Sequence, residues 1–519
     1  MNKPRKVPVT GVIDVGSGFM ELKIVQLTED GRFQVLEDVV KSLAIGRDTF
    51  SLGKLSPAMV DEICNVLSGF RQLLRDYHVR VFRAVATSAV REAKNRDYVL
   101  DQIQVRTGIS LEVLHNSEER YLTQLAVRHV IPEYTKLKTA GLLTMDIGSG
   151  SIQIAAYDDS GLVYNQNIRL GSLRIRQLLS SVEENSLQFP KVLEEYIISH
   201  IDQLKRQNVK ENYHFLIATG GEMEMVRRLC PGKEADLDIA SIDRDQFDAL
   251  YETMLYKSSR AIADEYGLEY ERAEMLIPTM MLLKTFWKMT ESQKLYCPYA
   301  GLLDGILWEL NEQYGMKQEE ENLDHEILSY ARVLAEQYHY DKDHVADVDG
   351  KAMMIFDHLA RPQRLGVRHR LLLRTAILLH DTGKYINLTN HAMCSSYIIQ
   401  SSELIGLTEE EQTMIMIIAR YHENGEPTMD DADYLGLGKK NRVAAAKLIA
   451  IIQLANSLDA SHKQKLDLVS VRSEEGNFIL RVRAGEDFLL EHWMFQKHSE
   501  FFRAVFGLQP ELKMKRGNM

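Results

Sequence analysis

The sequence predicts an α/β protein in which two similar halves face one cleft, followed by an all-helical domain and a small α+β tail. Three observations predict this arrangement. The loop sequence Asp-x-Gly-Ser-Gly occurs twice between apolar strands, at Asp14–Gly18 and at Asp146–Gly150, 132 residues apart. From about residue 324 apolar residues recur at helical spacing, and from about residue 466 they alternate as in strands. The predicted parts are 1–131, 132–312, 313–465 and 466–519.

The bulk composition excludes several classes of function. The chain has 519 residues, of which 45% are hydrophobic and 26% charged, which is ordinary for a soluble protein. No apolar run is long enough to cross a membrane, and the first residues lack a signal-peptide core. The four cysteines are scattered without metal spacing and look like reduced cytosolic thiols, so we expect a cytoplasmic protein. The net charge of −12 argues against general polyanion binding, so we expect no nucleic-acid partner, and a polyanionic substrate would require basic residues gathered locally.

The repeated loop has the chemistry of a phosphate site. Glycine lets the backbone approach a ligand closely and turn successive N–H groups toward it. Asp14 and Asp146 would repel a bare phosphate, so we expect Mg²⁺ between the carboxylates and the ligand. The strand Phe215–Thr219 ends in a third glycine turn. The alternative is a set of unrelated turns. The candidate phosphate-binding residues are Gly16, Ser17, Gly148, Ser149, Gly150, Ser151, Gly220 and Gly221.

The elements of the first half follow from apolar spacing. Residues 8–27 are predicted to form a hairpin around the first loop, and a second strand pair is expected near 33–40. Ser56-Pro57 opens a helix, because Ser is a good N-cap and Pro fits the first turn. Strands are predicted at 79–85 and 111–114, each leading into a helix.

A charged residue follows each of these two strands near the start of the next helix. Arg91 can clamp a phosphate with its fork of donors, although an ordinary surface arginine is the alternative. Glu119 lies in a first helical turn, where a carboxylate often only favours the helix dipole. The sharper interpretation is that this glutamate enters the cleft as a general base.

The second half repeats the strand–loop–strand pattern at 142–156. Arg169–Arg174 lies at a strand-to-helix step, and helices are predicted over 247–266 and 272–289. Residues 311–322 are rich in Glu, Gln and Asn and are predicted to form a linker.

The helical domain carries a second group of metal-binding residue types. An adjacent His-Asp pair, with a histidine one helix earlier and an acid some helices later, can form a metal centre in an all-helical domain. The alternative is a set of core histidines with ordinary hydrogen bonds. The candidates are His344, His380, Asp381, His422 and Asp459.

Together these motifs resemble the exopolyphosphatase / guanosine pentaphosphate phosphohydrolase (Ppx/GppA) family, in its long form with a C-terminal HD-like helical domain. The resemblance covers nearly the whole chain, and its most specific part is Thr87–Asn95, Thr-Ser-Ala-Val-Arg-Glu-Ala-Lys-Asn. It implies two actin-like domains of the ribonuclease H-like (ASKHA) class facing a cleft. The other matching motifs, in family order, are Asp14–Ser17, Ser117–Glu119, Asp146–Ser151, Arg169–Arg174 and Thr219–Gly221.

The resemblance also implies an activity and roles. The chain would hydrolyse the terminal phosphoanhydride of inorganic polyphosphate or guanosine pentaphosphate, in a cytoplasmic homodimer. Glu119 would deprotonate the attacking water, and Asp146 would hold Mg²⁺ with help from Asp14. The amides of Gly148–Ser151 would bind the terminal phosphate, and Arg91 would stabilise charge on the transferred group.

The chain departs from the family pattern at several positions. Gln153 replaces a carboxylate close to the chemistry, and an amide cannot act as a base. Gly18-Phe19 replaces two polar residues of the first loop. Leu303–Gly305 replaces Arg-Glu-Gly, and Asn456 stands where an HD-type metal site would have Asp. Such losses can cost orders of magnitude in rate, because single electrostatic contacts are worth ~10²–10³.

Three functions therefore remain open at the level of the sequence. The first is a Mg²⁺-dependent exopolyphosphatase, favoured by Glu119, Asp14, Asp146 and Arg91. The second is a weakly active or inactive relative that senses polyphosphate or guanosine penta- or tetraphosphate, favoured by Gln153 and Phe19. The third is an HD-type metal phosphohydrolase with a regulatory actin-like half, favoured by the histidine group and weakened by Asn456.

Overall fold

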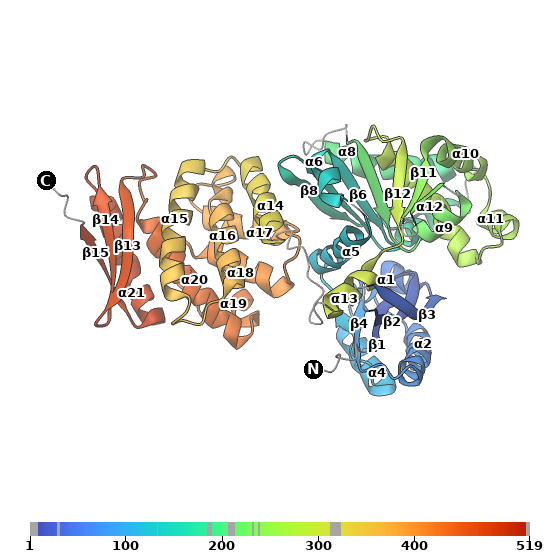
Figure 1. The fold of residues 1–519 in the computed structure, drawn as a ribbon, viewed down its shortest axis with the longest axis horizontal. Coiled ribbons are helices and arrows are strands. Elements are labelled where there is room, and N and C mark those ends of the chain that lie inside the picture. The colour runs from blue at the N-terminus through green and yellow to red at the C-terminus, as the bar shows by residue number, and fades with distance from the viewer. Residues whose placement is uncertain are drawn as a thin grey trace, which may run out of the picture. The chain divides into compact units, whose positions relative to one another are not determined.

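The computed structural model describes residues 9–28, 32–131, 133–183, 189–205, 213–230, 233–236, 239–311 and 323–514. The chain divides into two compact units, Met1–Glu321 and Asn322–Met519. The first unit contains two sheets with their helices, and the second contains a helical bundle and one small sheet (Figure 1). The expected α/β halves, helical domain and α+β tail are all present. None of the helices that the structure describes has an apolar stretch long enough to span a bilayer.

The first sheet has five strands in the order β3-β2-β1-β4-β5. The loop that starts at Gly16 joins β1 and β2 as predicted, whereas the expected second strand pair is the single strand β3, which pairs with β2. Helix α2 begins where predicted, with the Ser56 hydroxyl accepting from the Met59 amide. The strands are β1 (Val9–Val15), β2 (Phe19–Leu27), β3 (Phe33–Ser42), β4 (Val81–Ala86) and β5 (Glu112–Val113). The helices are α1 (Ile45–Leu52), α2 (Pro57–Asp76), α3 (Ser88–Arg91), α4 (Arg96–Thr107) and α5 (Asn116–Val130).

The second sheet has seven strands in the order β10-β11-β12-β9-β6-β7-β8. Its strands are β6 (Leu142–Ile147), β7 (Ile152–Asp158), β8 (Gly161–Ile168), β9 (Phe215–Thr219), β10 (Lys233–Asp236), β11 (Ile239–Asp243) and β12 (Lys294–Pro298). Its helices are α6 (Tyr134–Thr139), α7 (Ser172–Glu183), α8 (Phe189–Lys205), α9 (Met223–Leu229), α10 (Arg244–Met254), α11 (Ser259–Tyr266), α12 (Tyr270–Trp287) and α13 (Leu302–Asn311). The stretch predicted as one helix over 247–266 is two helices, α10 and α11.

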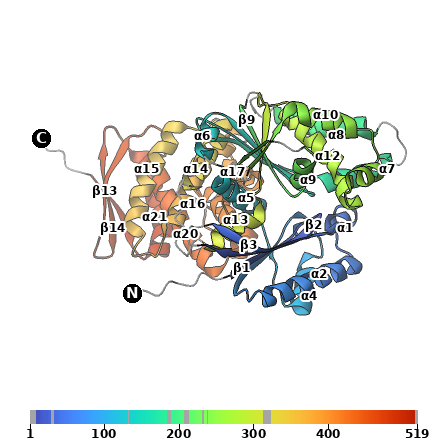
Figure 2. The ribbon, with the colours of Figure 1, turned by 45° about the vertical axis from the view of Figure 1, so that its right-hand side comes forward.

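The two sheets are structural repeats of one another. Both contain an antiparallel three-stranded meander whose first strand, β1 or β6, pairs in parallel with the next strand along the sheet, β4 or β9. The loops also match, because the Gly16 amide donates to the Phe19 carbonyl at 2.9 Å and the Gly148 amide to the Ser151 carbonyl at 3.0 Å. Figure 2 shows the two sheets, blue and green, with helices beside each. The repeat inferred from two short motifs therefore extends to the strand topology of the two sheets.

Helix α13 packs against the first sheet although it follows the last strand of the second. Leu303, Ile306 and Leu307 share a buried apolar cluster with Val12 and Val85 of the first sheet. The predicted linker follows this helix, and its residues 312–322 lie outside the described residues.

In the second unit the bundle and the tail share one apolar core. The bundle contains α14 (Leu323–Gln337), α15 (Lys342–Leu359), α16 (Val367–Leu379), the 3₁₀ turn η2 (Thr382–Tyr385), α17 (His391–Ser401), α18 (Glu409–Arg420), α19 (Ala432–Gly436) and α20 (Lys439–Ser457). The tail contains β13 (Leu466–Glu474), β14 (Asn477–Ala484), α21 (Leu489–Phe506) and β15 (Gln509–Met514), with the sheet order β13-β14-β15.

The closest approach of α13 to α5 depends on a glycine, which gives a test of this packing. A Cβ atom at Gly305 would lie 1.8 Å from the Leu122 carbonyl oxygen, whereas one at Gly301 would meet nothing within 4 Å. We expect Gly305→Ala to lower the free energy of unfolding by about 1–3 kcal/mol, as overpacking does. Gly301→Ala is the control, with a change within ~0.5 kcal/mol. Urea unfolding of the two variants checks this, and equal midpoints would contradict the packing.

Candidate active site between the two sheets

A cavity of about 570 Å³ lies between the two sheets of the first unit and is lined by both repeated loops. The structure brings together at this cavity all eight residues predicted to bind phosphate, and also Asp14, Glu119 and Asp146. These residues come from three strand ends and the first turn of α5. The predicted site residues that do not line it are Arg91, Gln153 and the group in the helical domain.

The two loops touch, and glycine makes the contact possible. A Cβ atom at Gly18 would lie 2.4 Å from the Ser149 hydroxyl oxygen, and one at Gly150 would lie 2.2 Å from the Ser88 hydroxyl oxygen. The Ser17 and Ser88 hydroxyl groups are hydrogen-bonded at 2.7 Å. A Cβ atom at either glycine would therefore overlap a serine hydroxyl, so these side chains or the loops themselves would have to shift.

The predicted metal ligands, Asp14 and Asp146, are partly buried carboxylates. Asp14 Oδ1 is buried and has no hydrogen-bond partner among the described residues. Burial, with Glu21 and Glu119 adding to it, holds the pKa of Asp14 well above its ordinary value. Burial also raises the pKa of Asp146 to about 6, although the Thr219 hydroxyl donates to it at 2.8 Å. A divalent cation bound by oxygen ligands would remove this cost, so these two residues fit Mg²⁺.

Glu119 is held by the arginine that was predicted to clamp phosphate. Arg91 Nη1 lies 3.0 Å from Glu119 Oε2 and also donates to the Leu114 carbonyl at 2.6 Å. Both side chains are only 15% exposed. Arg91 thus holds the carboxylate of Glu119 in place. Of the two residues, Glu119 lines the cavity and Arg91 does not.

Sequence reasoning missed several charged residues of the cavity. Glu222 accepts the Ser149 hydroxyl at 2.6 Å and the Ser172 hydroxyl at 2.9 Å, and it directly follows the predicted glycine turn. Arg272 lies with its guanidinium 5.1 Å from the centre of the Phe19 ring, and Lys23 donates to Asp304 at 2.9 Å. Eight carboxylates and three basic side chains line the cavity in total. A polyanion would be repelled from such a surface unless cations entered with it.

Gln153 lies behind Asp146. It is buried, accepts from Arg120 Nε at 3.3 Å, and lines a separate small cavity together with Arg120 and Asp146. Strand pairing places it opposite Asp146, as Glu21 is placed opposite Asp14. The repeat therefore has a glutamate in the first half where the second half has a glutamine.

The predicted residues of the helical domain also come together. His344, His380 and His422 all approach the Asp381 carboxylate, and Asp459 instead accepts from His344 Nδ1 at 2.8 Å. Burial lowers the pKa of His380 to about 3, so its ring is neutral at neutral pH.

Comparison with known proteins agrees with this fold. The sequence model of the Ppx/GppA phosphatase family matches residues 24–313, and that of Ppx/GppA phosphatase domain III matches residues 329–500. Exopolyphosphatase 1 of Mycobacterium tuberculosis is 29% identical over 165 residues, which are 32% of this chain and 47% of that protein. The chain thus spans about half the length of the mycobacterial relatives it matches.

Two further relatives extend the comparison. A guanosine-5'-triphosphate,3'-diphosphate pyrophosphatase of Photobacterium profundum is 20% identical over 457 residues, 86% of each chain. The crystal structure of an exopolyphosphatase from Cytophaga hutchinsonii, 20% identical, superposes with a TM-score of 0.52 over 59% of this chain and 98% of that one. This last likeness confirms the fold.

The fold and the cavity define an actin-like α/β protein whose two sheets each bring a glycine-serine loop to one cavity. The chain belongs to the Ppx/GppA phosphatase family, whose members are hydrolases of phosphoanhydride bonds. The resemblance inferred from the motifs is confirmed.

The pKa of Glu21 gives a test of the electrostatics of the cavity. Burial raises this pKa from 4.5 to about 7 although Lys23 opposes the shift. The folded chain therefore loses stability as the pH rises from about 4.5 through 7, because the ionised group is worse solvated than in the unfolded chain. We expect Glu21→Gln to stabilise the metal-free protein by up to about 3 kcal/mol at about pH 8.5 and by less than ~1 kcal/mol at about pH 5.

Thermal unfolding in EDTA at the two pH values measures this effect. Glu62→Gln, an exposed glutamate on α2, is the matched control. A stabilisation by Glu21→Gln that is the same at both pH values would contradict the raised pKa.

Proposed function

We propose that the cleft hydrolyses the terminal phosphoanhydride of inorganic polyphosphate or guanosine pentaphosphate, with Mg²⁺ as cofactor. The observation that carries the proposal is the meeting of Asp14, Glu119 and Asp146 with two glycine-serine loops in one cavity. Phosphoryl transfer requires little covalent chemistry from a protein. It requires an oriented phosphate, neutralised oxygen charge and a base for the water, and this cavity offers residues for each.

Each group has a stated role in this proposal. Backbone amides of Gly148–Ser151 hold the terminal phosphate, and the matching loop at Gly16 holds it from the other sheet. Glu119, fixed by Arg91, takes the proton of the attacking water. Bound to Asp14 and Asp146, Mg²⁺ would supply the positive charge that a cavity with eight carboxylates otherwise lacks.

The substrate class rests on the relatives. One is named an exopolyphosphatase and another a guanosine-5'-triphosphate,3'-diphosphate pyrophosphatase. Both names describe cleavage of a phosphoanhydride, so they support the reaction class and leave two substrates to compare. We further propose a cytoplasmic homodimer. Four free cysteines are consistent with the reducing compartment, and light scattering of the purified protein tests the dimer.

Replacing Glu119 tests the proposed base. We expect Glu119→Gln to reduce orthophosphate release from polyphosphate and guanosine pentaphosphate by at least ~10²-fold, because a positioned base contributes about that factor. Binding of polyphosphate should change little. Phosphate release is measured with Mg²⁺ and with EDTA, and EDTA should abolish it in the native protein.

The control is the neighbouring glutamate of the same helical turn. Glu118 pairs with Arg83 at 2.7 Å and does not line the cavity, so Glu118→Gln should leave release nearly unchanged. Release that survives Glu119→Gln would remove this residue as the base and would direct attention to His380 and Asp381.

A second candidate function is a weakly active or inactive sensor of the same ligands. Gln153 favours it, because the family has a carboxylate there and this chain has an amide beside a buried arginine. Phe19 favours it too, because an apolar ring lies where the first loop of the family is polar.

Restoring the carboxylate distinguishes the two functions. If the chain is a weakened enzyme, Gln153→Glu should raise the rate of phosphate release by about 10-fold or more, since one well-placed charge is worth ~10²–10³. Gln124→Glu is the control, because Gln124 is also buried and lines the same small cavity. An equal rate for native protein and Gln153→Glu would show that the glutamine is tolerated.

A further inference from the structure

Four histidine rings surround one buried carboxylate in the helical domain. Asp381 is 4% exposed and lies directly after α16, next to His380. Its Oδ1 lies 3.5 Å from His422 Nε2 and 3.6 Å from His391 Nε2. Its Oδ2 lies 3.6 Å from His380 Nε2 and 3.9 Å from His344 Nε2. All four rings therefore turn the same nitrogen toward one acid.

The other nitrogen of each ring, Nδ1, already has a hydrogen-bond partner. Each Nδ1 atom lies at hydrogen-bond distance from an acceptor that carries no proton. For three rings the acceptor is a backbone carbonyl: Ile377 for His380, Leu388 for His391 and Ala419 for His422. For His344 it is the Asp459 carboxylate. Since a carbonyl or a carboxylate can only accept, Nδ1 must carry the proton in each ring. Whenever such a ring is neutral, its Nε2 carries a lone pair, and this lone pair faces carboxylate oxygens that are also acceptors.

This arrangement is unfavourable unless a cation lies between the groups. Distances of 3.5–3.9 Å exceed those of N–H···O hydrogen bonds. Among the residues that the structure describes, His380 Nε2, Asp381 Oδ1 and His391 Nε2 are buried without a hydrogen-bond partner. Two ligand atoms bound to one metal at ~2.0–2.1 Å lie about 3.0–3.4 Å apart, so a small contraction of the group would close it around an ion.

Of the two carboxylate oxygens of Asp381, one is paired with a lysine and the other has no hydrogen-bond partner among the described residues. Lys384 Nζ lies 2.6 Å from Asp381 Oδ2, so that oxygen already has a cation. Oδ1 has none, and it faces His391 and His422. Ligand atoms of His380, Asp381 and His422 lie within 4.8 Å of one another, which is a span that a single ion can bridge.

We propose that the helical domain binds a divalent first-row transition metal ion through His380, Asp381 and His422, with His391 and His344 beside it to complete the coordination. Imidazole-rich sites select Mn²⁺, Fe²⁺, Co²⁺, Ni²⁺ or Zn²⁺ over Mg²⁺, which prefers oxygen. The hydrogen bonds on Nδ1 are the supporting contacts that orient metal-bound histidines, and Asp459 has this orienting role toward His344. The site does not depend on the cleft between the two sheets.

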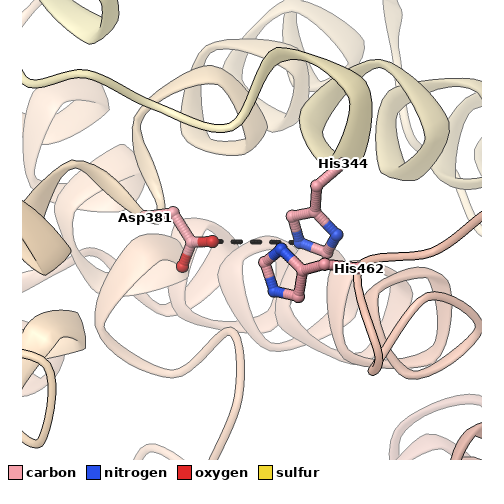
Figure 3. Close-up of side chains that lie close together, drawn as sticks. All are labelled: His344, Asp381 and His462. Carbon is pink, nitrogen blue, oxygen red and sulfur yellow. Dashed lines mark ion pairs between the residues drawn. The ribbon is translucent and has the colours of Figure 1, made fainter.

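Two partly exposed residues, His462 and Glu423, border the histidine group. The ring of His462 stacks on that of His344, with 3.6 Å between ring centres (Figure 3). Its Nδ1 lies 3.0 Å from Asp341 Oδ2. Glu423 Oε2 lies 3.4 Å from His391 Nε2 on another side. The side chain of His462 is 32% exposed and that of Glu423 is 38% exposed, so the histidine group lies near the surface of the helical domain.

Metal analysis of the full-length protein tests the proposal. The protein is stripped with a chelator, equilibrated separately with Mn²⁺ and Zn²⁺, freed of excess ion and analysed by mass spectrometry. We expect about one ion per chain in the native protein and an at least ~10-fold lower content in His380→Gln and in Asp381→Asn. His358→Gln replaces a histidine of the same unit that contacts Ser473 instead, and should keep its metal.

Two further measurements make the outcome independent of folding and of the cleft. Asp146→Asn should retain the transition metal, because that residue belongs to the other site. Pulsed electron paramagnetic resonance of Mn²⁺-loaded native protein should show nitrogen couplings from imidazole. Native protein that binds neither ion, variants His380→Gln and Asp381→Asn that both keep it, or Mn²⁺ without nitrogen couplings would each overturn the proposal.

Discussion

The active cleft depends on the contact between two short loops. Gly18 lies against the Ser149 hydroxyl, and Gly150 lies against Ser17 and Ser88. Arg174 supports the contact, because it donates to the Gly150 carbonyl at 2.7 Å and to Glu92 at 2.7 Å on the other half. Because each loop directly follows a strand that ends in Asp14 or Asp146, closing the loops also brings these two carboxylates toward one another. The close packing of the two loops thus depends on glycines that leave room for the serine side chains of the facing elements.

The same contact has an electrostatic cost. Strand ends at the bottom of a cleft are poorly solvated, and the pKa values of Asp14, Glu21, Asp146 and Glu222 are all raised by burial. A protein that only had to be stable would replace some of these groups with amides, as the second half has done with Gln153. Retaining the others makes physical sense if a cation and a phosphate occupy the cleft together, since the cation then neutralises both.

The sequence predicted the repeat and the loops because a motif of five residues recurred between strands of similar pattern. It also predicted that Glu119 enters the cleft and that the histidines and Asp381 form one group, because several histidines and an acid in this order are typical of a metal centre. It did not reveal Glu21, Lys23, Arg272 or Glu222, because a lone charged residue on a strand or helix carries no signal of where it points. Glu21 was nevertheless within reach, since the offset of 132 residues that relates Asp14 to Asp146 also relates Glu21 to Gln153. The contact of Arg91 with Glu119 could not be predicted, because it joins two helices through their tertiary packing.

The two proposed metal sites offer different ligand atoms, so each would select a different kind of metal ion. The cleft offers buried carboxylates and backbone amides, a donor set that suits a hard cation with its waters and a phosphate. The helical domain offers imidazoles whose Nδ1 atoms are fixed by hydrogen bonds, a set that suits a transition metal ion. Asn456 stands where an HD-type metal site would have Asp, and Asp459, three residues further on, accepts from His344 Nδ1 at 2.8 Å. In the proposed site Asp459 therefore supplies the acid that orients His344.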